Sequence, residues 1–261
     1  KKLDVIGIGN AIVDILTTES ENFLDSQGLP KGGMTLVGPT EAAQIYGSMG
    51  NHTSQNSGGS VANSMAGIAL LGGAGSYIGK VNDDQMGSLF RNDLKSLGVN
   101  FDTAPSTDGP PTAQCLVIVT PDGQRTMATY LGASTSLKPE DIDDKIIKDH
   151  KITYLEGYLW DTSQAKQAMI KAAELTRDSC GKVALSLSDV FCIERHRASF
   201  RGLIPNHIDI LFANEEEIKS LYQQSELKKA LDIGRGECDT LVVTLGHKGS
   251  LVANKEIVYN I

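Results

Sequence analysis

The sequence has 261 residues, of which 40% are hydrophobic, 5% are aromatic and 27 are glycines. A chain of this length can bury about 70–75% of its unfolded surface, so a single large domain needs no disulfides or structural metals. The formal net charge is −8 and the sequence has no basic cluster, which argues against nucleic acid or an anionic membrane as a partner.

The cysteines give no sign of disulfides or of a metal site. Cys115, Cys180, Cys192 and Cys238 are scattered without metal-ligand spacing, which is typical of reduced thiols in a cytoplasmic protein. The histidines show no paired ligand spacing either, so no zinc site is expected. No apolar run reaches about 18 residues, and a signal-peptide pattern is lacking. Residues 51–53 fit a glycosylation pattern, which has meaning only in a secreted protein.

The chain begins with a predicted buried strand. Residues 3–9 form an apolar run that ends in glycines, and a second apolar run, 12–16, is interrupted by Asp14. A carboxylate there must be exposed or held by hydroxyl donors, because burying it unpaired is costly. The glycines of the first run suggest a dinucleotide fingerprint, but its third glycine is missing, so a nicotinamide site is disfavoured.

Residues 57–63, Ser-Gly-Gly-Ser-Val-Ala-Asn, are predicted to be a glycine turn that leads into a helix. Apolar residues then recur at helical spacing until Gly72 and Gly73 end the run. Glycine lets a ligand approach closely, and the N–H groups of a helix start attract hydroxyl or phosphate oxygens. A glycine-capped core helix without a ligand explains the same pattern, and both interpretations stay open.

The first half of the chain also contains a clear β-hairpin signal. Residues 112–120 and 124–130 read as strands that flank the turn Pro-Asp-Gly. Because this hairpin interrupts an alternation of strands and helices, we expect it to join residues 12–17 and 34–37 in a small sheet that acts as a lid over a pocket. The other elements expected here are a strand over 76–81 and helices over 40–46 and 86–97.

From residue 152 onward, strands and helices alternate. The expected strands are 152–155, 183–187, 208–213, 241–244, 251–253 and 257–259, and the expected helices are 164–177, 194–203, 215–222 and 225–233. This order predicts an α/β fold with a mostly parallel central sheet and helices on both faces. Ligands of such sheets lie beyond the carboxyl ends of the strands. Polar or glycine residues follow the predicted strands there, which indicates a single site: Asp14, Gly58, Gly59, Glu156, Asp189, Asn214 and Gly246.

Two motifs in the second half have both a structural and a functional interpretation. Asn214 and Glu217 have the spacing of a helix capping box, but they also suit a hydrated Mg²⁺ beside phosphates, because Mg²⁺ prefers oxygen ligands and keeps waters. Residues 244–249, Thr-Leu-Gly-His-Lys-Gly, are either a glycine hairpin turn or a loop around nucleotide phosphates. The loop is not a Walker A motif, and no Gly-x-Ser-x-Gly elbow of a serine hydrolase occurs.

Together these stretches resemble the ribokinase/PfkB family of carbohydrate and nucleoside kinases. The resemblance is collinear from residue 3 to about residue 259 and rests on residues 57–63, 79–87, 214–217 and 244–249. Residues 119–127 and 154–161 are most similar to bacterial adenosine-kinase-like members. The resemblance implies a ribokinase-like fold with a small β-sheet lid, with ATP and Mg²⁺ as cofactors.

The resemblance also implies roles for individual residues. Those that would bind the substrate are Asp14, Gly58, Gly59, Asn63, Gln114 on the lid, and Glu156. Those that would bind ATP are Asn214, Thr244, Gly246 and Gly249, and Glu217 would organise the Mg²⁺.

One motif of the family is absent from these residues. The Gly-Ala-Gly-Asp sequence, whose Asp is the general base, does not occur, so no catalytic residue is assigned and we expect a C-terminally incomplete kinase domain over residues 1–261, with the base beyond Ile261. The expected reaction is phosphoryl transfer from ATP to a primary hydroxyl, first of all adenosine to AMP. The alternatives are a kinase of ribose, fructose or a related sugar, and a non-catalytic nucleoside-binding protein. We expect a small-molecule partner and a monomer or homodimer.

Overall fold

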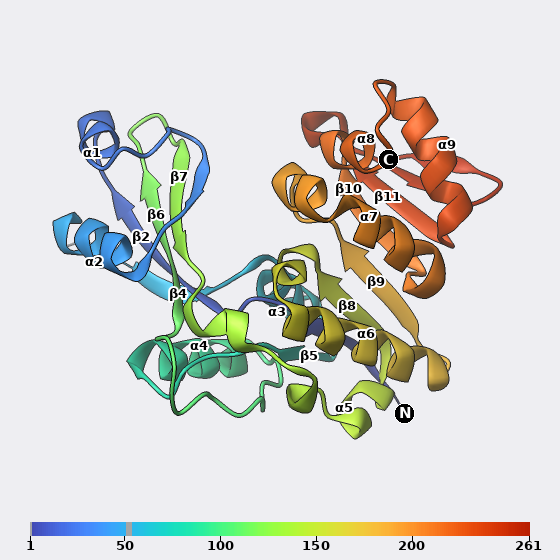
Figure 1. Ribbon diagram of the computed structural model, residues 1–261, viewed down its shortest axis with the longest axis horizontal. Coiled ribbons are helices and arrows are strands. Elements are labelled where there is room, and N and C mark those ends of the chain that lie inside the picture. Colours follow the sequence, from blue (N-terminus) through green and yellow to red (C-terminus); the bar gives the residue numbers. More distant parts are fainter. Residues whose placement is uncertain (1, 51–53) are drawn as a thin grey trace.

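The computed structural model describes residues 2–50 and 54–261, so the glycosylation pattern at 51–53 lies outside the described residues. The larger of its two β-sheets has the strand order β13-β12-β11-β10-β9-β8-β1-β5 (Figure 1). Neighbouring strands are parallel except β12, which runs antiparallel to both β11 and β13. The strands are β1 (Leu3–Ile8), β5 (Gly75–Ile78), β8 (His150–Glu156), β9 (Lys182–Ser186), β10 (Ile210–Asn214), β11 (Thr240–Thr244), β12 (Ser250–Ala253) and β13 (Val258–Asn260).

Helices cover both faces of this main sheet. Ile6 and Leu155 belong to one buried cluster together with α6, whereas Val5 and Tyr154 pack against a second cluster that includes α3. The alternation follows from the two-residue period of a strand, which sends neighbouring side chains to opposite faces. The helices of this part are α3 (Ser60–Leu70), α4 (Gln85–Ser96), α5 (Asp144–Lys148), α6 (Ser163–Asp178), α7 (Val190–His207), α8 (Glu215–Tyr222) and α9 (Leu227–Glu237), and the short 3₁₀ turns are η1 (Gly132–Ser136), η2 (Pro139–Asp141), η3 (Gly157–Asp161) and η4 (Gly246–Lys248).

The second sheet stands apart from the main sheet, with α1 (Glu21–Ser26) and α2 (Pro39–Ser48) on its far side (Figure 1). Its strand order is β3-β7-β6-β2-β4. One face buries Val13, Leu116 and Ala128 against α1 and α2. The strands are β2 (Ile12–Thr18), β3 (Met34–Leu36), β4 (Ser54–Gly58), β6 (Ala113–Val119) and β7 (Arg125–Tyr130).

The α/β architecture with a mostly parallel central sheet and a second, smaller sheet confirms the fold predicted from the sequence. Strand β4 and helix α1 were not predicted. β4 has no apolar alternation, and it is a strand because it pairs antiparallel with β2. Helix α7 begins earlier than expected, since Asp189 caps it by accepting from the Cys192 N–H at 2.6 Å, and its backbone is kinked at His196. Within the described ranges, the helices are too short or too polar to cross a membrane.

Candidate active site

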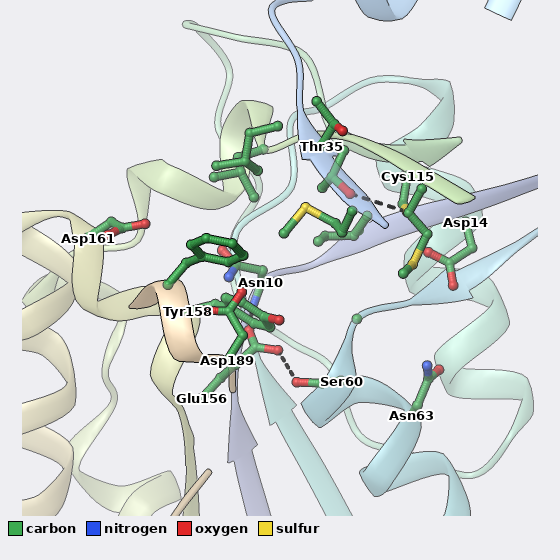
Figure 2. Close-up of a pocket in the computed structure, with 18 of the residues that line it drawn as sticks. Asn10, Asp14, Thr35, Ser60, Asn63, Cys115, Glu156, Tyr158, Asp161 and Asp189 are labelled. Atoms are coloured by element: carbon green, nitrogen blue, oxygen red, sulfur yellow. Dashed lines mark hydrogen bonds between the residues drawn. The ribbon is translucent and has the colours of Figure 1, made fainter. Parts of the chain in front are cut away.

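A cavity of about 550 Å³ lies between the second sheet and the carboxyl ends of the central strands of the main sheet. Figure 2 shows Asp14 and Asn63 on one side, Asp161 on the opposite side, and Asn10, Glu156, Tyr158 and Asp189 between them. The apolar part of the lining consists of Ile12, Met34, Leu36, Met127, Leu131 and Phe191. The cavity therefore has a polar floor and an apolar wall, which is the usual character of a small-molecule site.

Asp14 lies on β2, on the face of the second sheet that borders the cavity. Burial raises the pKa of its carboxyl group to about 6, and the charge of Arg125 opposes that shift. Within residues 2–50 and 54–261 no hydrogen bond or ion pair to this carboxylate is formed. A partly buried carboxylate without partners is costly, and the hydroxyl groups of a ligand would satisfy it.

The glycine turn before α3 brings the start of that helix to the cavity. Gly59 has φ +97°, and a Cβ atom there would lie 2.5 Å from the Asn10 carbonyl oxygen, so this position requires glycine. Asn63, in the first turn of α3, is exposed and lines the cavity. Gly59 lines it too, whereas Gly58 borders Asp14 from the neighbouring strand β4.

Glu156, the last residue of β8, forms the floor of the cavity. Its side chain is 1% exposed; one oxygen accepts a hydrogen bond from the Asn10 N–H at 2.6 Å, and the other accepts from the Ser60 hydroxyl (Figure 2). Burial raises the pKa of this carboxyl group, and these hydrogen bonds oppose the shift. The carboxylate is thus already engaged by two segments of the chain.

Acidic side chains continue from the cavity toward α8. Burial raises the pKa of the Tyr158 hydroxyl far above its usual value, and the charges of Asp189, Glu156 and Glu217 add to that shift. The charge of Asp189 also contributes to a raised pKa of Glu217, whose main cause is burial. Asp189, which lines the cavity, therefore connects it electrostatically with Glu217.

The four residues predicted to bind ATP lie further along the same edge of the main sheet. In register, Glu156 of β8 pairs with Ser186 of β9, and Asn214 of β10 pairs with Thr244 of β11. Because these strands are parallel, their carboxyl ends share one edge. Asn214, Thr244, Gly246 and Gly249 are exposed there but are not among the residues that line the cavity. Gly246 has φ +61° and Gly249 has φ +89°, a conformation that favours glycine.

Asn214 and Glu217 form a reciprocal capping box. The Asn214 N–H and side-chain amide donate to the two Glu217 oxygens at 2.9 and 2.7 Å, and the Glu217 N–H donates to Asn214 Oδ1 at 2.8 Å. No three His, Cys, Asp or Glu residues among those described are grouped to hold a metal ion. Carboxylate oxygens that each accept one hydrogen bond suit the water shell of a magnesium ion better than direct ligation, so this donor set fits Mg²⁺ held through water.

Gln114, which was predicted to bind the substrate from the lid, is not among the residues that line the cavity. It precedes Cys115 on β6, and Cys115 lines the cavity instead, where its thiol accepts from the Thr129 hydroxyl at 3.4 Å. Successive side chains of a strand point to opposite faces, so Gln114 shares the face of Leu116, which packs toward α1 and α2.

Several lining residues were not foreseen from the sequence. Arg195 and His196 of α7 both donate to Asp161 at the end of η3, and Arg195 and Asp161 line the cavity. Phe191, in the first turn of α7, is 70% exposed within the cavity lining. The position of residues 157–161 directly after β8, within the stretch 154–161 that resembles adenosine-kinase-like proteins, could have indicated Asp161.

Known proteins share both sequence and fold with this chain. Residues 33–261 match the pfkB family carbohydrate kinase. The adenosine kinase of Sinorhizobium meliloti superposes with a TM-score of 0.93 and 42% identity over 100% of this chain and 80% of that protein. A probable sugar kinase of Rhizobium etli CFN 42 superposes with a TM-score of 0.93 and 38% identity, over 100% of this chain and 79% of that protein.

Curated relatives are more distant. The guanosine-inosine kinase of Escherichia coli (strain K12) is 25% identical over 95% of this chain. The chain spans 59% of the length of that relative.

Proposed function

This chain belongs to the pfkB family of carbohydrate kinases, and from that membership we propose that it acts as an ATP-dependent kinase of a small molecule. The γ-phosphate is transferred to a primary hydroxyl of the acceptor. The acceptor that we propose is a purine nucleoside, with adenosine, converted to AMP, as the first choice.

The observation that carries this proposal is that one cavity combines a carboxylate able to bind hydroxyl groups with an apolar wall. Asp14 presents a carboxylate without a described partner, and Met34 and Leu36 are 38% and 51% exposed in the lining of the same cavity. With Phe191 they make an exposed apolar surface, which in a folded protein indicates a ligand. A ribose accounts for the carboxylate, and an attached base accounts for the wall.

Within this proposal, the substrate's ribose is held by Asp14 and Asn63, and the glycines of the turn before α3 let it approach the backbone. The triphosphate is held by Thr244 and Asn214 and by the exposed backbone around Gly246 and Gly249. Glu217 holds the waters of a magnesium ion, which neutralises charge on the phosphates. Glu156 and Asp189, which lie between Asp14 and the proposed triphosphate site, repel the phosphates from the cavity floor. Asp14 is thus left to bind the acceptor.

A sugar kinase is the second candidate, because the probable sugar kinase of Rhizobium etli is 38% identical over the whole of this chain. A bare sugar such as ribose or fructose would use Asp14 and Asn63 in the same way. It would leave the apolar wall without a function.

The test is release of ADP by the natural protein with adenosine, guanosine, inosine, ribose and fructose. We expect kcat/KM for adenosine to exceed that for either sugar by at least about tenfold. A higher kcat/KM for a sugar than for adenosine would overturn the nucleoside proposal. Nucleoside binding without ADP release would indicate a non-catalytic nucleoside-binding protein.

Phe191→Ala separates the two classes of acceptor. The variant should lower kcat/KM for the nucleoside about tenfold or more and leave turnover of a sugar unchanged. An aromatic contact contributes about 1 kcal/mol in addition to the free energy gained by burying its apolar surface, and the variant loses both. Tyr259→Ala is the matched control, because this aromatic residue is exposed outside the cavity. A cytoplasmic location and a monomeric or homodimeric state are further predictions, which fractionation and light scattering would test.

A further inference from the structure

The chain crosses between the two sheets in several segments, including those before β6 and after β7, and two of the crossings meet at Glu156. Residues 9–11 lead from β1 to β2, and residues 58–60 lead from β4 to α3. We call these two segments the hinge. The orientation of the second sheet at the hinge sets the width of the cavity, because the cavity lies between the sheets.

Glu156 connects both hinge segments to the main sheet. Its carboxylate accepts from the Asn10 N–H at 2.6 Å in the first segment and from the Ser60 hydroxyl in the second. These contacts span 146 and 96 residues of sequence. No ion pair to Glu156 forms within the described residues, so the burial of its charge is compensated by hydrogen bonds alone, from Asn10, Ser60 and the Val61 backbone.

The packing of the hinge leaves little room for other arrangements. A Cβ atom on Gly9 would lie 3.0 Å from Glu156 Oε2, and a Cβ atom on Gly79 would lie 2.8 Å from the Gly9 carbonyl oxygen. A Cβ atom on Gly59 would lie 2.5 Å from the Asn10 carbonyl oxygen. Glycines at these positions let the backbone segments and the carboxylate come into direct contact.

We propose that Glu156 is a positioning residue that fixes the hinge, and that it acts on the acceptor through Asn10 and Ser60 rather than by binding the acceptor itself. Asn10 lies four residues before Asp14, and Ser60 lies three residues before Asn63. One carboxylate thus sets the separation of the two polar side chains assigned to the acceptor. The assignment of an acceptor to this cavity rests on the proposed function, whereas the role of Glu156 in the hinge does not.

The experiment measures hydrogen exchange of the backbone amides in the natural protein without ligand. Glu156→Gln keeps the shape of the side chain but removes its charge, so the Asn10 N–H and the Ser60 hydroxyl lose the stronger, ionised acceptor. We expect exchange over residues 9–16 and 58–64 to become at least about tenfold faster, while residues 182–186 of β9 keep their rate. Ser60→Ala should speed exchange in the same two ranges by a smaller factor.

The controls are Ser64→Ala, one turn later on α3, and Glu174→Gln on the exposed side of α6; both should leave exchange at 9–16 unchanged. In the double variant Glu156→Gln/Ser60→Ala, we expect the effects to be less than additive, because both changes weaken the same contact between residues 156 and 60.

A parallel measurement of kinetics tests the consequence for the acceptor. Glu156→Gln should raise the KM of the acceptor about tenfold or more and change the KM of ATP less than twofold. A raised acceptor KM with unchanged hydrogen exchange would overturn the proposal and assign Glu156 to direct binding. If Glu156→Gln does not fold, Ser60→Ala decides alone, and unchanged exchange at 9–16 in that variant would also overturn it. Failure of every acceptor to react would refute the proposed function and leave the exchange result valid.

Discussion

Gly58 and Asp14 lie so close together across strands β4 and β2 that a Cβ atom on Gly58 would be 2.2 Å from the carboxyl carbon of Asp14. Glycine at position 58 is therefore what leaves the Asp14 carboxylate in its place beside the cavity. The second glycine of the turn serves a different purpose, since it permits the backbone conformation of Gly59.

Gly58→Ala should displace the Asp14 side chain and raise the KM of the acceptor at least about tenfold, with little change for ATP. Steady-state kinetics with each substrate varied in turn measures both values. Gly67→Ala, at an open position within α3, is the control and should keep both KM values while raising stability by about 0.5–1 kcal/mol. If Gly58→Ala raised the KM of ATP as much as the KM of the acceptor, this would contradict the role assigned to Asp14.

Binding of the acceptor should depend on pH through Asp14. Its pKa is about 6 in the free protein, and only the ionised carboxylate accepts charge-assisted hydrogen bonds with both of its oxygens. The affinity should therefore fall about tenfold for each pH unit below 6 and be constant above about pH 7. Calorimetric titration without ATP between pH 5 and 8 measures this, with Asp25→Asn on the exposed part of α1 as control. A flat profile in the unmodified protein would exclude Asp14 as the acceptor's partner.

The same carboxylate should lower the stability of the fold. Its pKa is raised from 3.8 to about 6 on folding, so the folded state binds its proton more tightly and loses stability as pH rises through this window. Asp14→Asn should raise the free energy of unfolding at pH 8 by up to about 3 kcal/mol, and the gain should shrink between pH 6 and 4. Urea unfolding across this range measures it; a gain of equal size at pH 4 and 8 would show that titration is not the cause.

Glu217→Ala tests whether the capping box also serves a metal. Loss of the reciprocal hydrogen bonds with Asn214 should lower stability by about 1 kcal/mol in any case. If the carboxylate also holds magnesium-bound water, the Mg²⁺ concentration for half-maximal activity should rise several-fold. Glu216→Ala, an exposed neighbour on α8, serves as the reference. An unchanged Mg²⁺ requirement would leave capping as the whole role of Glu217.

Lys80 and Asp141 form a buried ion pair at 2.6 Å, with both side chains 8% exposed. Asp141→Asn should lower the free energy of unfolding by about 3 kcal/mol, because it leaves a buried charge uncompensated. The pair Lys80→Met/Asp141→Leu should recover most of that loss. Chemical denaturation of both variants decides, and a double variant no more stable than the single one would show that the charges contribute more than their burial costs.

The sequence was sufficient to predict the main sheet, because its strands are apolar runs separated by helices with clear periodicity. It was insufficient for β4, whose residues Ser-Gln-Asn-Ser-Gly form a strand only through pairing with β2. Local pattern carries no information on such pairing.

The candidate site shows the same division. The order of polar residues after strands predicted Asp14 and Glu156 at the cavity. On β6, however, Cys115 and Leu116 are both apolar, so alternation could not tell that Cys115 borders the cavity and that Gln114 lies on the other face. The partners of Glu156 lie 146 and 96 residues away, a distance that no local pattern spans.

The cavity wall on the second sheet is separate from the residues that hold the fold together. Met34, Leu36 and Met127 border the cavity and belong to neither buried cluster. Replacements at these positions can reshape the space for an acceptor with little effect on folding. An ancestral protein of this design could thus change its acceptor preference through a few tolerated substitutions, while the sheet edge that we propose for ATP stayed the same.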